Sequence, residues 1–105
     1  MVEVINLRIC KDWGKPGDIV IDRRTKYGNP YFMHNETQRD FVCDKFEIYF
    51  DKQLREHKLN LDDLNNAKRL GCWCKQPDKE VRCHGDYIKK LLDNRPISNQ
   101  QSLNL

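Results

Sequence analysis

The sequence predicts a small single α/β domain, with a short sheet of three or more strands packed by about three helices. A period-two apolar pattern near the N-terminus indicates a strand, and a long apolar repeat at spacings of three and four indicates a helix. A chain of 105 residues with 38% hydrophobic content can bury only one modest core. We expect residues 1–94 to form this domain and the polar residues 95–105 to form a flexible tail.

Two short segments in the first quarter of the chain predict strands. Residues 2–8 show a period-two pattern with β-branched side chains, and residues 19–21 read Ile-Val-Ile. Residues 13–18, between them, contain two glycines and a proline, which indicates a loop. Because the two strands are consecutive, they are candidates for pairing as a hairpin with a long connection.

Apolar spacings of three and four predict helices in the middle of the chain. The longest covers residues 37–57, where Asn35 or Thr37 can serve as the N-cap. A shorter helix follows it, with Asn60 as its N-cap.

The C-terminal third is predicted to contain a strand at residues 70–74, a polar loop at residues 75–82 and a helix that begins near Cys83 or His84. The first turn of a helix presents unpaired backbone N–H groups and the positive end of the helix dipole, which lower the pKa of a thiol placed there. Cys83 is therefore a candidate reactive cysteine.

Three cysteines and a histidine cluster in this region. Cys72 and Cys74 point to one face of an extended segment because side chains alternate along a strand. Zinc would take Cys72, Cys74, Cys83 and His84 as a Cys3His set, although the spacing is unlike the usual C-x2-C pairs. Nucleophilic catalysis would use Cys83 or Cys74 with His84 as its base. A third interpretation also stays open, in which the cysteines are small buried apolar residues of the core and His84 only caps a helix.

A basic loop follows the second predicted strand and ends in Gly-Asn-Pro. Arginine can bind a phosphate or carboxylate with two hydrogen bonds, and glycine lets backbone N–H groups approach an anion. Ligands in α/β domains often bind directly after a strand. The candidate ligand-binding residues are Arg23, Arg24, Lys26, Gly28 and Asn29. The alternative is a solvated turn, and neither glycine-rich nucleotide-binding motif is present.

The composition argues against several classes of protein. Lys and Arg total 19 against 16 Asp and Glu, a net charge of +3, which does not indicate a nucleic-acid binder. No apolar run is long enough to span a membrane, and the N-terminus has no features of a secretory signal. Five cysteines, an odd number, fit a reducing compartment with thiols that are reduced or metal-bound. We therefore expect a cytoplasmic protein.

Four blocks of sequence together resemble a known family. They read R-x-C-K-x-W-x-K-P at residues 8–16, V-I-D-R-R-T-K-Y-G-N-P-Y at 20–31, L-G-C-W-C at 70–74 and C-H-G-D-Y at 83–87. Over residues 4–94 the chain resembles a prokaryotic and viral domain of unknown function, number 4326. The resemblance implies a small stand-alone protein, often phage-encoded, that acts in nucleotide metabolism or in phage–host conflict. The chain departs from the family pattern at Lys75, where members have proline, and in its longer loop before the C-H block.

The last block adds Asp86, which lies in the first turn of the predicted helix. Its carboxylate can cap backbone N–H groups, or it can orient His84 or a substrate hydroxyl. The candidate catalytic residues are thus Cys74, Cys83, His84 and Asp86, while the sequence leaves open whether the protein is an enzyme.

The predicted function is the binding, and on the enzymatic interpretation the processing, of an anionic small molecule that is phosphate-bearing or nucleotide-like. This prediction places the basic loop and the cysteine cluster in one pocket. Two other classes of function stay open. One is a zinc-stabilised binding module without catalysis, and the other is a phage-encoded protein that binds or inhibits a host protein partner.

Overall fold

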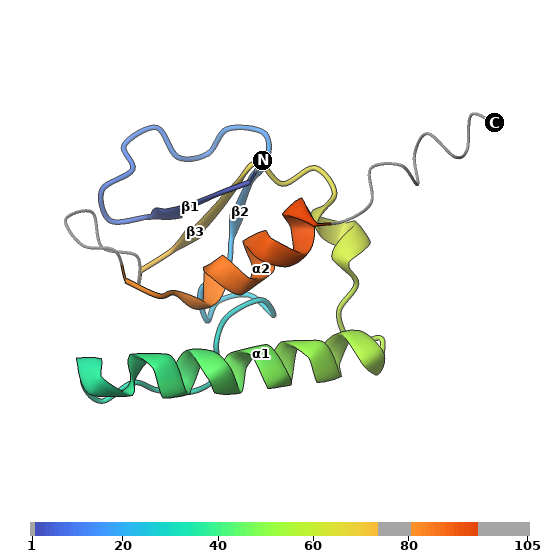
Figure 1. The fold of residues 1–105 in the computed structure, drawn as a ribbon. Helices are drawn as coiled ribbons and strands as arrows, with labels where there is room; N and C mark the ends of the chain where they lie inside the picture. Colours follow the sequence, from blue (N-terminus) through green and yellow to red (C-terminus); the bar gives the residue numbers. More distant parts are fainter. Residues whose placement is uncertain (1, 74–80, 95–105) are drawn as a thin grey trace.

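The computed structural model describes residues 2–73 and 81–94, and within them it contains a three-stranded sheet and two α-helices (Figure 1). The α/β class predicted from the sequence is confirmed. The tail predicted at residues 95–105 lies outside the described residues.

All three strands run parallel, in the order β1-β3-β2. Their bounds are Glu3–Asn6 for β1, Asp18–Val20 for β2 and Arg69–Cys72 for β3. Leu70 in the central strand lies opposite Val4 on one side and Ile19 on the other. Because the strands are parallel, their carboxyl ends meet at one edge of the sheet.

The predicted hairpin of the first two strands is wrong, since β3 lies between β1 and β2. Burial explains this order: Leu70 and Cys72 are fully buried, whereas β2 is only half-buried and β1 is half-buried to exposed. The strand that buries most of its side chains takes the centre, where both its edges are paired and both its faces are covered. A parallel arrangement of β1 and β2 then requires residues 7–17 to cross back to the start of β2.

The helix α1 spans Arg39–Arg55 and confirms the longest predicted helix. A 3-10 turn, η1 at Glu36–Gln38, precedes it, and Asn35 caps that turn by accepting a hydrogen bond from the Thr37 N–H. Val42, Cys43, Phe46 and Phe50 form the buried face of α1. In the described part of the chain, no helix is long and apolar enough to cross a membrane.

The helix count is lower than predicted, because the helix expected after Asn60 is only the 3-10 turn η2 at Leu61–Leu64. Asn60 does cap it, accepting a hydrogen bond from the Asp62 N–H. Two asparagines follow Leu64, and asparagine disfavours a continuing helix because its side chain competes for the backbone hydrogen bonds.

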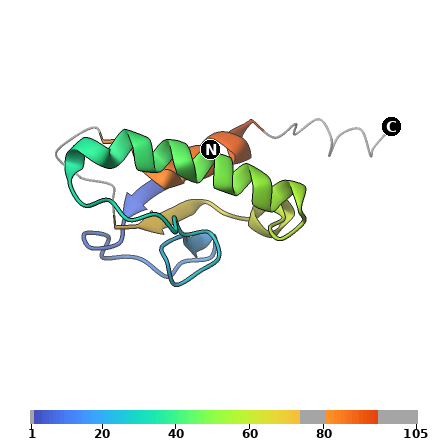
Figure 2. The ribbon, with the colours of Figure 1, turned by 90° about the horizontal axis from the view of Figure 1, so that it is seen from below.

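The last helix, α2 at His84–Asp93, packs against β1 and β3, and α1 packs against α2. Both helices lie on one side of the sheet, and residues 7–17 lie on the other (Figure 2). Gly71 permits this second layer, since a β-carbon there would lie 2.7 Å from the Trp13 ring. The sheet is thus covered on both faces.

Arg69 ties the start of β3 to the loop before β2. Its Nε and Nη2 donate to the two carboxylate oxygens of Asp18 at 2.7 and 2.6 Å, and its Nη1 lies 3.0 Å from the carboxylate of Asp12. The Asp18 side chain is only 2% exposed. These hydrogen bonds from Arg69 hold the pKa of Asp18 well below its usual range.

We expect the ion pair between Arg69 and Asp18 to make the free energy of unfolding depend on pH in the acid range. Because the pKa of Asp18 is lower in the folded than in the unfolded chain, its contribution is fully present above the unfolded value of about 3.9 and is lost as pH falls through the folded pKa. Urea midpoints of the wild type and Asp18→Asn, measured from pH 7 down to pH 2, should differ at neutral pH and converge in acid. Glu3→Gln, on the exposed end of β1, is the control. A difference between wild type and Asp18→Asn that stays constant with pH would contradict this prediction.

Candidate functional site

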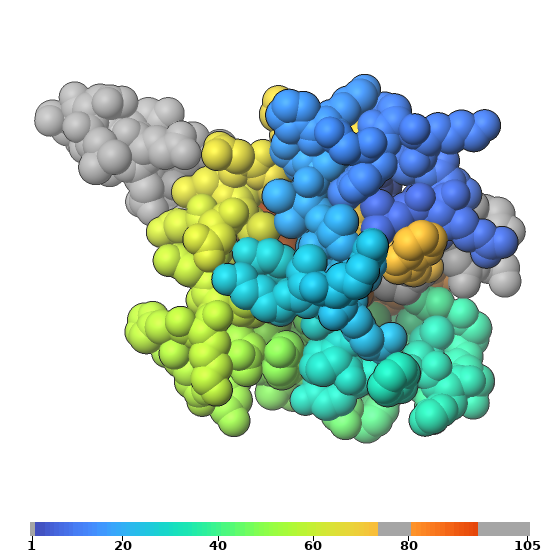
Figure 3. All heavy atoms as spheres, turned by 180° about the vertical axis from the view of Figure 1, so that it is seen from behind, coloured from blue at the N-terminus to red at the C-terminus, as the bar shows by residue number. Residues whose placement is uncertain are grey.

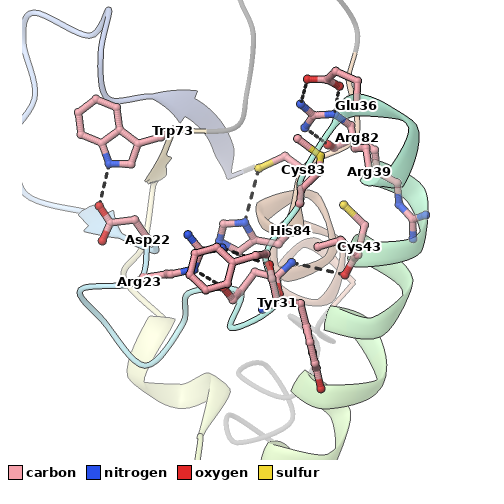
Figure 4. Close-up of a pocket in the computed structure, with 14 residues that line it drawn as sticks. Asp22, Arg23, Tyr31, Glu36, Arg39, Cys43, Trp73, Arg82, Cys83 and His84 are labelled. Carbon is pink, nitrogen blue, oxygen red and sulfur yellow. Dashed lines mark hydrogen bonds and ion pairs between the residues drawn. The ribbon is translucent and has the colours of Figure 1, made fainter.

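A pocket of about 440 Å³ opens at the edge of the sheet where β2 and β3 end. Its walls come from both ends of the loop at residues 22–33, from the η1 turn and the start of α1, from Trp73, and from residues 82–84 at the start of α2. The loop contributes residues 22, 23, 29 and 31–33. Figure 3 shows the corresponding surface, where the orange segment directly after β3 borders a hollow beside the cyan and teal segments. Figure 4 shows how the side chains converge on it. The basic loop and the C-H block, predicted to meet, therefore line one pocket.

His84 forms part of the floor of the pocket. Its Nε2 lies 2.7 Å from the carbonyl oxygen of Ile21, and its ring packs edge-on against Phe46, with centroids 5.1 Å apart. Burial lowers the pKa of His84, although the bond to Ile21 works in the opposite direction. The imidazole is therefore neutral near pH 7. It donates from Nε2 to Ile21 and turns Nδ1 toward Cys83.

Cys83 is the N-cap of α2. Its Sγ accepts a hydrogen bond from the Gly85 N–H at 3.4 Å, and the carboxylate of Asp86 accepts one from the Cys83 N–H at 3.0 Å. The Cys83 side chain also accepts from the Asp86 N–H, which completes a capping box between Cys83 and Asp86 and fixes where the helix begins. Asp86 thus has the capping role, and it lines a smaller hollow of about 130 Å³ rather than the main pocket. Its catalytic role stays a prediction.

Cys72 and Cys83 meet beneath the pocket, with 3.1 Å between their sulfurs. Two sulfurs that each lie 2.3 Å from a tetrahedral zinc would be about 3.8 Å apart, so this spacing does not match a zinc site. Among residues 2–73 and 81–94, no three cysteine, histidine or acidic side chains are arranged to hold a metal ion. Cys74 lies outside the described residues, and its predicted roles in catalysis and in a Cys3His site stay predictions.

Of the cationic residues predicted in the basic loop, only Arg23 lines the pocket. Its Nε donates to the Asn29 carbonyl at 3.0 Å and its Nη2 to the Tyr31 carbonyl at 3.1 Å. Arg24 instead forms an ion pair with Asp22 at 2.7 Å. Lys26 lies 3.6 Å from Asp63, near η2 and away from the pocket.

Gly28 and Asn29 shape the loop. A β-carbon on Gly28 would collide with the Asp22 carbonyl and would lie 2.7 Å from the Arg23 Cα, so only glycine fits there. Asn29 is 9% exposed; its amide donates to the Val42 carbonyl at 3.4 Å and its side-chain oxygen accepts from the Tyr31 N–H at 2.9 Å. Asn29 therefore holds the loop against α1, while its side chain also borders the pocket.

Several pocket residues were missed by the sequence reasoning. Trp73 is 55% exposed, and its indole N–H donates to Asp22 at 2.9 Å. Phe32 is 68% exposed and lies under the Arg23 guanidinium, 4.1 Å from its ring centre. The alternation along the third strand does place Trp73 on the face opposite the cysteines, but nothing local indicates that Phe32, at the end of a loop, reaches the same pocket.

Two further arginines that the sequence reasoning missed, Arg39 and Arg82, line the pocket and have acidic partners. Arg39 pairs with Glu36 at 2.8 Å, and Arg82 pairs with Asp44 and Glu47 at 2.7 and 2.6 Å. Cys43 is buried and also borders the pocket, and burial raises the pKa of its thiol.

The fold and the pocket define a small α/β domain with a parallel sheet and an open pocket at the carboxyl edge of its strands. The chain belongs to the family described as Domain of unknown function (DUF4326), whose model matches residues 5–94. This confirms the family predicted from the basic loop and the cysteine blocks. No curated protein and no solved structure matches the chain.

Proposed function

We propose that the pocket binds a small molecule that carries a phosphate group and an aromatic ring, as a nucleotide does. The observation that carries the proposal is the position of the pocket: it opens at the carboxyl edge of a parallel sheet, beside the start of α2. Open parallel sheets bind their ligands at this edge. A volume of about 440 Å³ also falls in the range of small-molecule sites.

Arg23 is the group best placed to meet the phosphate. The Asn29 and Tyr31 carbonyls and the Phe32 ring hold its guanidinium in place. Within residues 2–73 and 81–94, no carboxylate forms an ion pair with Arg23, in contrast to Arg39 and Arg82. A positioned guanidinium with its charge not neutralised by a carboxylate is suited to an anionic ligand.

Two exposed aromatic side chains at the pocket suit the ring of the ligand. Trp73 and Phe32 are both more than half exposed and both line the pocket. Large aromatic side chains are costly to leave in water, and a flat apolar face can stack on a base. The Asp22 carboxylate fixes the edge of the Trp73 indole, so this surface is held in one orientation.

The test is a calorimetric titration with adenosine diphosphate, and with pyrophosphate as the probe without a ring. We expect both to bind and the nucleotide to bind more tightly. Arg23→Gln should weaken the binding of adenosine diphosphate at least tenfold, because a hydrogen bond to a charged group contributes on the order of 1.5 kcal/mol or more.

The matched control is Arg24→Gln, one residue away, whose side chain pairs with Asp22 and does not line the pocket. It should change affinity by less than about threefold, since exposed ion pairs contribute little. Failure of both probes to bind, or equal weakening by the two substitutions, would remove the proposal.

A further inference from the structure

The binding of a phosphate compound gives no role to the two thiols that meet beneath the pocket. Cys72, at the end of β3, and Cys83, at the N-cap of α2, have their sulfurs 3.1 Å apart. Both are present as thiols and are 0% and 1% exposed. Neither of the other described cysteines, Cys10 or Cys43, has such a contact with a second described thiol.

The two thiols differ in access. Cys83 borders the pocket, whereas Cys72 is not among the residues that line it. A small reagent that enters from solvent therefore meets Cys83 first, and Cys72 lies directly behind it.

The surroundings of Cys83 favour reaction at its sulfur. The Gly85 N–H at the start of α2 points to Sγ at 3.4 Å, and a helix N-terminus stabilises a thiolate. Nδ1 of His84 lies 3.9 Å from the same sulfur and can accept its proton. Figure 4 shows the Cys83 sulfur and the His84 ring facing each other.

We propose that Cys83 and Cys72 form a redox-active dithiol that reduces a hydroperoxide entering through the pocket. The Cys83 thiolate attacks one peroxide oxygen, the O–O bond breaks, and Cys83 becomes a sulfenic acid while the leaving oxygen takes a proton. The Cys72 sulfur then attacks the Cys83 sulfur, the S–O bond breaks, and water leaves with the Cys72 proton. Two thiols have supplied two electrons, and the product is a Cys72–Cys83 disulfide.

The second step needs little movement. A disulfide bond is about 2.05 Å long, so sulfurs that start 3.1 Å apart approach by about 1 Å. Both residues belong to the same buried cluster, which keeps the sulfurs together during the reaction. A thiol compound in excess returns the pair to the reduced state by thiol–disulfide exchange.

The test treats the full chain with hydrogen peroxide, blocks the remaining thiols, and maps tryptic peptides by mass spectrometry. We expect residues 70–75 linked to residues 83–89, with the link removed by dithiothreitol. Because residues 70–75 also contain Cys74, the experiment is repeated with Cys74→Ala, in which the same link should form. His84→Gln should slow its formation at least tenfold if Nδ1 accepts the proton.

Cys43→Ala is the matched control, since Cys43 also borders the pocket but has no partner thiol among the described residues. In this variant the link between Cys72 and Cys83 should form as in the wild type. Fragmentation of the linked wild-type peptide in the mass spectrometer assigns the bond to Cys72 or to Cys74 without any substitution. The wild-type map therefore decides the outcome even where a variant is unstable. Loss of the link in Cys74→Ala, oxidation of Cys43 in place of Cys83, or thiols that resist peroxide because the protein carries stoichiometric zinc would each overturn the proposal.

Discussion

Phe46→Ala should produce the largest loss of stability of any single aromatic truncation in α1. Phe46 is fully buried and its ring lies 5.3 Å from Phe50 and 5.1 Å from His84, measured between centroids. Removing a buried phenylalanine side chain costs about 3 to 5 kcal/mol, from lost apolar burial and the cavity left behind. That is a large part of the total stability of a small domain.

The measurement is urea unfolding followed by circular dichroism. Phe41→Ala is the matched control, because Phe41 lies in the same helix but is 63% exposed, and it should change stability by no more than about 0.5 kcal/mol. Since Phe46 also supports the His84 ring, its truncation should weaken ligand binding in any folded protein that remains, whereas Phe41→Ala should not. Similar midpoints for the two variants would contradict the burial of Phe46 in the core.

Gly28→Ala should have the second largest effect, although it adds a single methyl group. The new β-carbon would overlap the Asp22 carbonyl and lie 2.6 Å from the Asp22 carbonyl carbon. These atoms are backbone and cannot rotate away as the end of a side chain would. We expect a loss of about 3 kcal/mol, at the upper end of the usual cost of overpacking.

The same urea experiment tests this prediction. Lys26→Ala, two residues earlier in the loop, is the control, since the Lys26 side chain is 55% exposed and its ion pair with Asp63 is at the surface. The Gly28 variant should also lose affinity for adenosine diphosphate, because the loop that presents Arg23 must move. If the urea midpoint of Gly28→Ala equals that of the wild type, the loop accommodates a β-carbon at this position and the prediction is wrong.

The candidate site could be predicted in part. The basic loop and the C-H block do line one pocket, and Arg23, Cys83 and His84 lie in it as the sequence suggested. Arg24 and Lys26 could not be separated from Arg23, because all three are cationic residues of one loop. Their positions depend on Asp22 and Asp63, and the contact of Lys26 with Asp63 joins segments far apart in the chain.

The sequence by itself determined the local elements. The spacing of apolar residues predicted α1, the β-branched segments predicted β1 and β2, and the polar side chains of Asn35 and Asn60 marked the turns that they cap. It also placed Cys83 at the start of α2. These features depend on residues within a few positions of one another, so their pattern can be seen directly in the chain.

Only the tertiary structure decided the order of the strands and which residues each site residue contacts. The burial of Leu70 and Cys72 places β3 between two strands that are adjacent in sequence, and that arrangement brings the Ile21 carbonyl to His84. The close approach of Cys72 to Cys83 follows from the packing of α2 on the sheet. Such contacts are set by which surfaces bury each other, a property of the whole chain that no local pattern contains.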